Sequence, residues 1–372
     1  MGRAMRKAIG LMSGTSMDGI DAALIETDGG DQVRPIGFYF LPYSPEMRAR
    51  LRQAMAEALE MAQPEPSPFI LEVEQQQTRL HAEAVAALRA QHGGPVDVIG
   101  FHGQTIAHRP ERGWTWQIGD GALLAELTGT TVVYDFRSAD VAAGGHGAPL
   151  IPAYHRALMA PLRELRGLGC RQAMAVLNLG GVGNITWAGV RDDDILAFDT
   201  GPANALIDDW VHHHSNLTHD EGGKLAASGT VDAKILDALC AHPWFQEAPP
   251  KSLDRHDFHS HAVAGLSLED GAATLTAFTA ETVRLAFQHL PEPPAQLLVT
   301  GGGRHNATLM EMLRVRLKID VRPVESVGWH GDALEAEGFA YLAVRVLEDL
   351  PLSWPTTTGV CAPQKGGRIA RR

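Results

Sequence analysis

The chain has 372 residues, of which 45% are hydrophobic and 20% charged, a composition typical of a globular protein with room for two packed cores. Its formal net charge of -12 and the absence of a dense Lys/Arg face argue against nucleic acid or an anionic membrane surface as the main partner. The three cysteines, Cys170, Cys240 and Cys361, lie too far apart to predict a disulfide framework or a zinc motif. With no apolar run as long as a membrane span, we expect a cytoplasmic protein.

The chain begins with two apolar runs joined by a turn of small residues, within 8–25. This pattern predicts two strands, and Gly14 and Gly19 permit backbone angles and close approaches that a Cβ would forbid. The hydroxyls of Thr15 and Ser16 and successive N–H groups could then converge on a phosphate. An ordinary hairpin of turn-forming residues is the simpler explanation of this stretch taken alone.

The rest of the first half indicates an α/β domain with a mixed sheet. The pattern predicts a third strand over 32–41, helices over 45–61 and 69–91, and single strands over 96–102 and 131–135. Just after Arg137 the composition changes to a stretch rich in Gly and Ala. We therefore expect a domain boundary there.

The second half repeats the arrangement of strand, small-residue turn and strand, with its turn at 179–184. Two such hairpins facing across a cleft could hold the two ends of a triphosphate. A later strand over 296–300 runs into Gly301, Gly302 and Gly303 ahead of a helix, whose N–H groups favour a phosphate or a polar nucleoside edge. Further helices are predicted from 151 onward and over 204–211, 231–239, 267–289 and 332–347.

Asp199 follows a buried apolar run and precedes a predicted helix. Carboxylates at the carboxyl ends of strands in α/β cores face the ligand crevice, so Asp199 could accept a proton from an attacking hydroxyl or water. An equally supported alternative is that Asp199 caps the following helix. In the first half, polar residues at strand ends and helix starts would suit a polyhydroxylated, acidic small molecule: His102, Gln104, Asp120 and Arg137.

Two features are expected to carry no function. The histidines at 212–214 and 256–261 lack metal-ligand spacing, and we expect a solvated helix end and a polar loop. The basic residues at 365–372 are expected to form a frayed terminus.

Taken in order, these motifs resemble the anhydro-N-acetylmuramic acid kinases, a family in the superfamily of sugar kinases, heat-shock chaperone ATPases and actin. The matching segments, from Gly10 to about Ala343, are GLMSGTSMDGID, IGFHGQTI, QIGD, DFR, LNLGGVGNIT, FDTGPAN, PPKS, VTGGGRHNATLM and GDALEAEGFA. The resemblance implies a two-lobed actin-like ATPase fold, each lobe with an RNase H-like mixed sheet flanked by helices. We expect the first lobe over 1–137, the second over 138–350 and a tail over 351–372.

The resemblance also implies a reaction: an ATP-dependent kinase opens 1,6-anhydro-N-acetylmuramic acid with water and phosphorylates the freed O6. The product, N-acetylmuramic acid 6-phosphate, belongs to peptidoglycan recycling. Mg²⁺ would accompany ATP, the enzyme would be a homodimer, and Asp199 resembles the base that activates the water. The ATP-binding residues it implies are Gly14, Thr15, Ser16, Met17, Asp18, Gly19, Ile20 and Asp21, then Gly180, Gly181 and Asn184, and finally Gly301, Gly302, Gly303 and Asn306. The sugar would contact His102, Gln104, Asp120, Arg137 and Glu335, with Glu335 also counted as catalytic.

The chain departs from the superfamily pattern at two positions. Met12 stands near the place of an Asp that many members carry in the first phosphate loop, so no metal ligand is predicted by name. Ala203 stands where a Gly is expected. Two alternatives remain open: a kinase for another sugar or small acid, or a phosphatase, on the same loops; and a non-catalytic nucleotide-dependent module such as a chaperone lobe or a sugar-sensing repressor.

Overall fold

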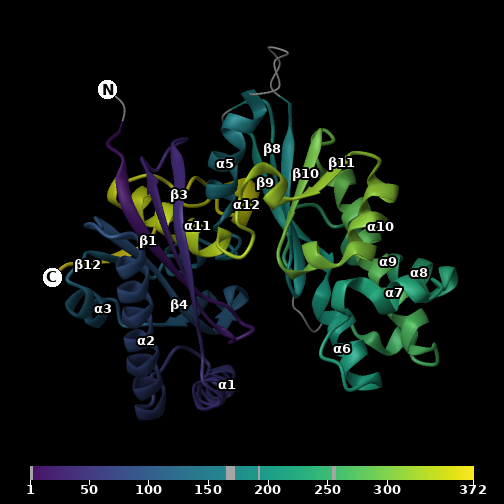
Figure 1. The fold of residues 1–372 in the computed structure, drawn as a ribbon, viewed down its shortest axis with the longest axis horizontal. Coiled ribbons are helices and arrows are strands. Elements are labelled where there is room, and N and C mark those ends of the chain that lie inside the picture. Colours follow the sequence, from purple (N-terminus) through teal and green to yellow (C-terminus); the bar gives the residue numbers. More distant parts are fainter. Residues whose placement is uncertain (1–2, 165–171, 192, 254–256) are drawn as a thin grey trace. The chain divides into compact units, whose positions relative to one another are not determined.

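The computed structural model describes residues 3–164, 172–191, 193–253 and 257–372, and the chain divides into two compact units (Figure 1). Unit 1 comprises Met1–Pro161 and Asp332–Arg372, and unit 2 comprises Leu162–Gly331. Cys170 and His256 lie outside the described residues. Within the described part of the chain, every helix is too short or too polar to cross a membrane.

The sheet of unit 1 has the strand order β12-β6-β4-β1-β2-β3, with β5 paired to β4. Strands β1, β2 and β3 form an antiparallel meander, and β4 and β6 continue the sheet in parallel on the other side of β1. The strands are β1 (Arg6–Ser13), β2 (Gly19–Thr27), β3 (Val33–Pro42), β4 (Val98–Arg109), β5 (Trp114–Ile118), β6 (Val132–Tyr134) and β12 (Arg368–Ala370).

The sheet of unit 2 repeats this topology, with the order β11-β10-β7-β8-β9. Its strands are β7 (Met174–Leu179), β8 (Val182–Ala188), β9 (Ile195–Pro202), β10 (Gln296–Thr300) and β11 (Asp320–Pro323). Here too an antiparallel meander of three strands is followed by two parallel strands beside its first strand. This shared order confirms the prediction of an RNase H-like mixed sheet in each half.

Helices cover both faces of the unit 1 sheet. They are α1 (Pro45–Leu59), α2 (Pro68–His92), α3 (Gly121–Thr128), α4 (Ser138–Ala142), α5 (Pro152–Glu164), which runs past the unit boundary, α11 (Leu334–Leu347) and α12 (Pro355–Thr358). Ser44 and Ser67 start α1 and α2, because each hydroxyl accepts an N–H from the first turn and a proline follows at once. The buried faces of α1 and α2 share one apolar cluster with Ile9 and Leu11 of β1.

Helix α11 packs against β1, β2 and β4 (Figure 1). The close approach depends on two paired glycines: a Cβ on Gly10 would lie 1.7 Å from the Ala336 oxygen, and one on Gly100 would lie 2.0 Å from the Phe339 oxygen. The compact units therefore divide the chain differently from the expected 138–350 range. Residues 138–161 and α11 belong to unit 1, and α11 is separated in the sequence from the first part of that unit by unit 2.

Unit 2 has two apolar clusters. One covers the sheet, and the other lies among helices around Trp210, Phe245 and Phe278. The helices are α6 (Asn204–His214), α7 (Lys224–Ser228), α8 (Ala233–Cys240), α9 (Leu268–Ala286) and α10 (Ala307–Leu317). The second cluster shows that residues inserted after β9 form a helical subdomain with its own core.

The C-terminal tail is not frayed. Strand β12 pairs antiparallel with β6, and the Arg368 guanidinium lies 5.5 Å from the centre of the Tyr134 ring. The prediction of a frayed terminus was wrong because composition could not reveal that β6 leaves an edge to which three residues of the tail can pair.

Candidate active site

The turn between β1 and β2 presents two exposed hydroxyl residues, Thr15 and Ser16. The Ser16 hydroxyl donates to Asp18 at 2.8 Å, and the Met17 N–H donates to the Gly14 carbonyl at 3.1 Å. The left-handed residue of this turn is Met17, with φ 54°, whereas Gly14 has no positive φ and a Cβ there would make an ordinary contact, 3.7 Å from Ser16 Oγ. The reason predicted for Gly14 was therefore wrong.

For Gly19 the predicted reason is confirmed, because a Cβ there would lie 2.4 Å from the Leu41 oxygen of the neighbouring strand. Ile20 is fully buried in the core of unit 1, so only its backbone can face a ligand. The turn thus offers a ligand backbone groups and two hydroxyls rather than apolar side chains.

A buried chain of hydrogen bonds holds this turn against β4. The Tyr43 hydroxyl donates to the Ser13 hydroxyl at 3.0 Å. The Ser13 hydroxyl donates to Gln104 Oε1 at 2.6 Å. The amide Nε2 of Gln104 donates to the Gly14 carbonyl at 3.2 Å. Sequence reasoning missed Ser13 and Tyr43, and it assigned Gln104 to the sugar without this second role. Gln104 is fully buried within β4, which continues seven residues past His102 to Arg109.

The side chains of His102 and Arg137 are joined by a hydrogen bond in the candidate site. Arg137 Nε donates to His102 Nε2 at 3.0 Å, so the ring proton must sit on Nδ1, which donates to the Gly103 carbonyl at 2.8 Å. Burial, together with the Arg137 charge, holds the pKa of His102 well below its ordinary value. Burial also lowers the pKa of Arg137 to about 10, an effect that Glu335 and Asp140 oppose. The structure thus presents a neutral imidazole that orients a charged guanidinium.

The carboxylates near the first turn repel one another. Burial is the main cause that raises the pKa of Asp21 to about 7, and the charges of Asp18, Glu335 and Asp332 raise it further. Asp21 lies opposite Met12 in the β1–β2 register. A cation at this place would lower the cost of ionising Asp21.

Asp120 has a local structural role. It is the N-cap of α3, and its Oδ1 accepts the N–H groups of Ala122 and Leu123 at 2.9 and 3.0 Å. This capping interaction explains why an aspartate stands before α3. Glu335 lies exposed in the first turn of α11.

In unit 2 the structure brings the two predicted glycine elements together. Asn204 donates its side-chain amide to the Leu179 carbonyl at 2.7 Å and its N–H to the Gly180 carbonyl at 2.9 Å, which fixes the β7–β8 turn. Gly301 has φ 75° and lies so close to this turn that a Cβ would be 2.6 Å from the Leu179 oxygen. Glycine at this position therefore lets the two turns share one edge of the sheet.

The third element continues from Gly301 into a 3-10 helix over Gly302–His305 and then α10. Asn306 caps α10 by accepting the Leu309 N–H at 2.9 Å. Gly181 and Gly302 are exposed, whereas Gly303 and Asn306 are buried. The edge of unit 2 thus presents backbone from both turns at the start of a helix, an arrangement suited to phosphate or a nucleoside.

Asp199 lies within β9, opposite Asn184 of β8. It does not cap α6, because β9 continues to Pro202 and the N-cap is Ala203. Of the two explanations for this aspartate, the helix cap is excluded. Burial raises the pKa of Asp199 to about 7, although its Oδ2 accepts the Leu253 N–H at 2.9 Å.

The PPKS segment, which entered the sequence analysis only as a family motif, holds Asp199 in place through hydrogen bonds. The carbonyl of Lys251 accepts the Asp199 N–H at 3.1 Å. The Lys251 ammonium is buried and donates to the carbonyls of Trp244 at 3.0 Å and Phe245 at 3.3 Å. Burial lowers the pKa of Lys251 to about 8. The PPKS motif was the sequence signal for this segment. The motif does not show that the loop packs against β9 and binds Asp199.

The histidines at 212–214 lie in the last turn of α6. Among the described residues, no three His, Cys, Asp or Glu side chains are placed to hold a metal ion. His213 and His214 bond through Nδ1 to the carbonyls of Asp209 and Trp210, one turn back in α6. The predicted helix end is therefore confirmed for 212–214. Cys240 and Cys361 are free thiols.

The fold and the candidate site together indicate a class of protein. Two RNase H-like units, each with a glycine-containing turn at one end of its meander, are the architecture of the actin-like ATPase fold. A family model described as "Anhydro-N-acetylmuramic acid kinase" matches residues 6–371. The chain belongs to the anhydro-N-acetylmuramic acid kinase family.

Curated relatives agree with this family. A protein named anhydro-N-acetylmuramic acid kinase from Rhizorhabdus wittichii is 58% identical over 97% of this chain and 97% of its own. One of the same name from Zymomonas mobilis is 53% identical over 97% of this chain and 99% of its own. Among solved structures, a ROK family glucokinase from Streptomyces griseus, in complex with glucose and AMPPNP, is 14% identical, with a TM-score of 0.40 and coverage of 91% and 99%.

Proposed function

We propose that this chain is an ATP-dependent kinase that opens the anhydro ring of 1,6-anhydro-N-acetylmuramic acid with water and phosphorylates O6. The product would be N-acetylmuramic acid 6-phosphate, an intermediate of peptidoglycan recycling. Membership of the family over residues 6–371 supports this reaction. The observation within the site that carries it is Asp199, a strand carboxylate with a pKa near 7 and no helix to cap.

The reaction balances in one turnover. Water attacks the anomeric carbon and gives a proton to Asp199, the bond from that carbon to O6 breaks, and O6 takes the γ-phosphoryl group of ATP, which leaves ADP. A base whose pKa lies near the working pH is best suited to this proton transfer. Asp199 fits this requirement, because burial raises its pKa to about 7.

The ATP phosphates would bind at the first turn, from Gly14 to Asp21, and at the second, through Gly180, Gly181 and Asn184. Gly301, Gly302, Gly303 and Asn306 would contact the nucleoside. The exposed hydroxyls of Thr15 and Ser16 and the close packing of Gly301 on the second turn support these roles. Bound at such turns, phosphate oxygens accept hydrogen bonds from backbone N–H groups.

Mg²⁺ would accompany ATP, and the donor set fits it. Mg²⁺ is held by one or two carboxylates together with substrate phosphates and water, rather than by an all-protein cage. Asp18 and Asp21 supply carboxylates at the phosphate turn, and burial, together with the charges of negative neighbours, raises the pKa of Asp21 to about 7. Mg²⁺ would neutralise phosphate charge during the transfer.

The sugar would contact His102, Gln104, Asp120, Arg137 and Glu335, with Glu335 also near the chemistry. Arg137 supports this role, because His102 and the Gly147 carbonyl hold its Nε and Nη1 in place. Among the described residues its Nη2 makes no hydrogen bond. A guanidinium positioned in this way can bind the carboxylate of an acidic sugar. Unit 1 would thus contribute the sugar contacts and the first phosphate turn, and unit 2 the base Asp199, the second phosphate turn and the nucleoside contacts.

Product analysis tests this function. The protein is incubated with ATP, Mg²⁺ and the anhydro sugar in water enriched in ¹⁸O, and the products are identified by mass spectrometry and NMR. We expect equal amounts of ADP and the 6-phosphate, with one ¹⁸O on the anomeric carbon. ADP without ¹⁸O in the sugar, or no consumption of the sugar, would contradict the proposal. We also propose a cytoplasmic homodimer, which sedimentation of the purified protein would test for assembly.

A further inference from the structure

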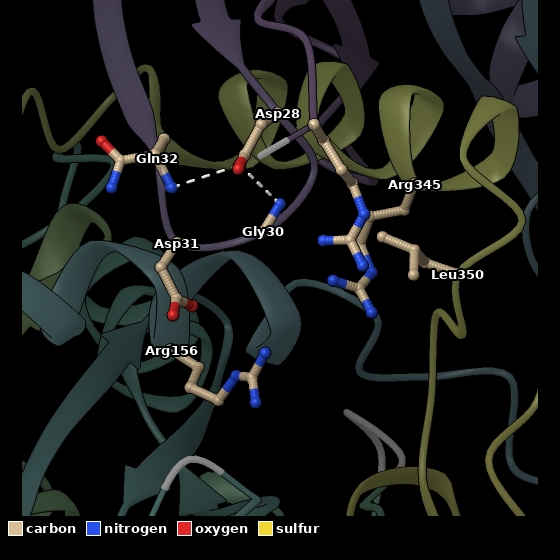
Figure 2. Close-up of a pocket in the computed structure, with 8 residues that line it drawn as sticks. Asp28, Gly30, Asp31, Gln32, Arg156, Arg345 and Leu350 are labelled. Carbon is tan, nitrogen blue, oxygen red and sulfur yellow. Dashed lines mark hydrogen bonds between the residues drawn. The ribbon is translucent and has the colours of Figure 1, made fainter. Parts of the chain in front are cut away.

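A polar cavity of about 400 Å³ lies in unit 1, away from the candidate active site (Figure 2). It is bounded by the β2–β3 turn and by residues of α5 and α11. Its lining residues are Arg3, Asp28, Gly30, Asp31, Gln32, Arg156, Arg345 and Leu350. The β2–β3 turn and the Gly14 turn are at opposite ends of β2, whose nine residues span roughly 30 Å.

Arg345 is the buried cation of this cavity, with a relative exposure of 5%. Its Nε donates to the Pro351 carbonyl at 2.7 Å, and its Nη1 donates to the Gly29 carbonyl at 2.8 Å and to the Tyr341 hydroxyl at 3.1 Å. All three acceptors are neutral. Among the described residues no carboxylate lies within ion-pair distance of Arg345. A buried cation without an opposite charge is costly, so an anion would stabilise this site.

Two further arginines increase the positive charge. Arg3 and Arg156 line the same cavity, and both Arg156 and Arg345 lie over the Trp354 ring, at 6.0 and 5.5 Å from its centre. Figure 2 shows the guanidinium groups of Arg156 and Arg345 pointing into the same space. Burial is the main cause that lowers the pKa of Arg345; Tyr341 opposes this shift, and the charges of Arg156 and Arg3 add to it.

The two aspartates of the cavity do not supply the missing charge. Asp28 Oδ1 accepts the N–H groups of Gly30 at 2.7 Å and Gln32 at 3.2 Å, which makes Asp28 the residue that stabilises its own turn. Asp31 is exposed. The three guanidinium groups therefore outnumber the two carboxylates, and the buried one has no carboxylate partner among the described residues.

We propose that this cavity binds a phosphate group, either inorganic phosphate or the phosphoryl group of a small sugar phosphate, through Arg345, Arg156 and Arg3. The forked guanidinium matches phosphate oxygens and gives short, charge-assisted hydrogen bonds. The volume falls in the range of small-molecule sites. This site goes beyond the proposed function, since it uses none of the residues assigned to ATP or the anhydro sugar.

The location of the arginines gives the site a structural consequence. Arg156 is carried by α5, in which the chain leaves unit 1, and Arg345 by α11, which begins two residues after the chain returns at Asp332. One bound phosphate would join these two helices. Glu335 precedes Arg345 by ten residues on α11, about 15 Å along the helix axis.

Calorimetric titration of the full-length protein tests the site. The protein is first saturated with a non-hydrolysable ATP analogue and Mg²⁺, so that the phosphate turns are occupied, and is then titrated with inorganic phosphate or with glucose 6-phosphate at constant ionic strength. We expect one saturable site. Its affinity should fall about tenfold in Arg345→Gln and about fivefold in Arg3→Ser, as for lost hydrogen bonds to a charged group. The control variant Arg112→Ser removes an exposed arginine elsewhere in unit 1 and should bind as the wild type does.

Arg3→Ser keeps the test decisive even if Arg345→Gln does not fold. Arg3 is exposed and makes no hydrogen bond among the described residues, so its loss should leave the fold intact. Saturable binding of either probe that weakens in Arg3→Ser supports the site, and the tighter probe identifies the source of the phosphate. Absence of saturable binding by both probes, or equal affinity in Arg3→Ser and the wild type, would overturn it. The titration needs no turnover, so its outcome is independent of the proposed reaction.

Discussion

Replacing Asp199 by Asn tests both the proposed base and its cost to the fold. The variant keeps the size of the side chain, and an amide oxygen can still accept the Leu253 N–H that lies 2.9 Å from Oδ2. The amide cannot take a proton from water. We therefore expect turnover to fall about 10³-fold, as is usual when a general base is removed, while the affinity for ATP stays the same.

The same substitution should stabilise the protein. Burial raises the pKa of Asp199 from 3.8 to about 7. A difference of this size corresponds to at most about 4 kcal/mol for holding the charge in the folded state. As the pH rises, Asp199 ionises in the unfolded chain before it does so in the folded protein. The free-energy cost of its burial therefore starts near pH 3.8, grows up to about pH 7 and is constant above that pH. Asp199→Asn removes the cost, so its thermal midpoint should exceed that of the wild type by more at pH 8 than at pH 5.

Two measurements decide this prediction. Release of ADP in the presence of the anhydro sugar, followed from pH 5.5 to 9, should give a wild-type kcat/KM that rises with pH and levels off above about 7. Thermal unfolding at pH 5 and pH 8 gives the stability difference. Asp194→Asn is the matched control, because Asp194 pairs with the exposed Arg191 at the start of the same strand. Turnover of Asp199→Asn within fivefold of the wild type would refute the base, and an equal gain in midpoint at both pH values would refute the argument from burial.

Three further predictions address the sugar site, the core and the tail. Arg137→Lys should raise the KM for the sugar about tenfold and leave the KM for ATP unchanged. The reason is that a lysine cannot donate to His102 and also bind a carboxylate through two hydrogen bonds. Steady-state kinetics measure both KM values. Gly10→Ala should lower the free energy of unfolding by about 3 kcal/mol, since its Cβ would overlap the backbone of α11, whereas Gly14→Ala should change it little; denaturant unfolding measures the difference. Deletion of 366–372 should lower the thermal midpoint, because it removes β12 from the edge of β6.

Each of these predictions has an outcome that contradicts it. Equal losses of sugar and ATP affinity in Arg137→Lys would indicate a general disturbance of unit 1 rather than loss of a sugar contact. Similar unfolding energies for the Gly10 and Gly14 variants would mean that α11 can move away from the sheet. An unchanged midpoint after the deletion would show that the tail contributes nothing to stability.

The main strands and helices of both units were predictable because their signals are local. Apolar runs such as those of β1 and β10 give strands wherever they pack, and serine followed by proline starts α1 and α2 through contacts within one turn. Short elements such as β5, β11 and β12 were missed. Three to five residues carry little signal of their own, and their pairing partners lie elsewhere in the chain.

The residues of the candidate site were assigned from the sequence, and that assignment stays a prediction; how their side chains are arranged could not be predicted. The tautomer of His102 depends on Arg137, 35 residues away, and Gln104 is tied to Ser13 across two strands. Buried contacts such as these come from tertiary packing and leave no periodic pattern in the sequence. The role of Tyr43 was missed for the same reason.

The sequence by itself determined the repeated meander, the glycine turns and the identity of the acids, because turn chemistry and strand patterning act between neighbours. Only the tertiary structure decided what those acids do. It shows that Asp120 caps a helix and that Asp199 does not. Asp199 lies inside a strand, held by a loop more than fifty residues later, and burial there raises its pKa to about 7. Burial depends on every segment that packs around a group, and this is why a local reading of the chain could not supply it.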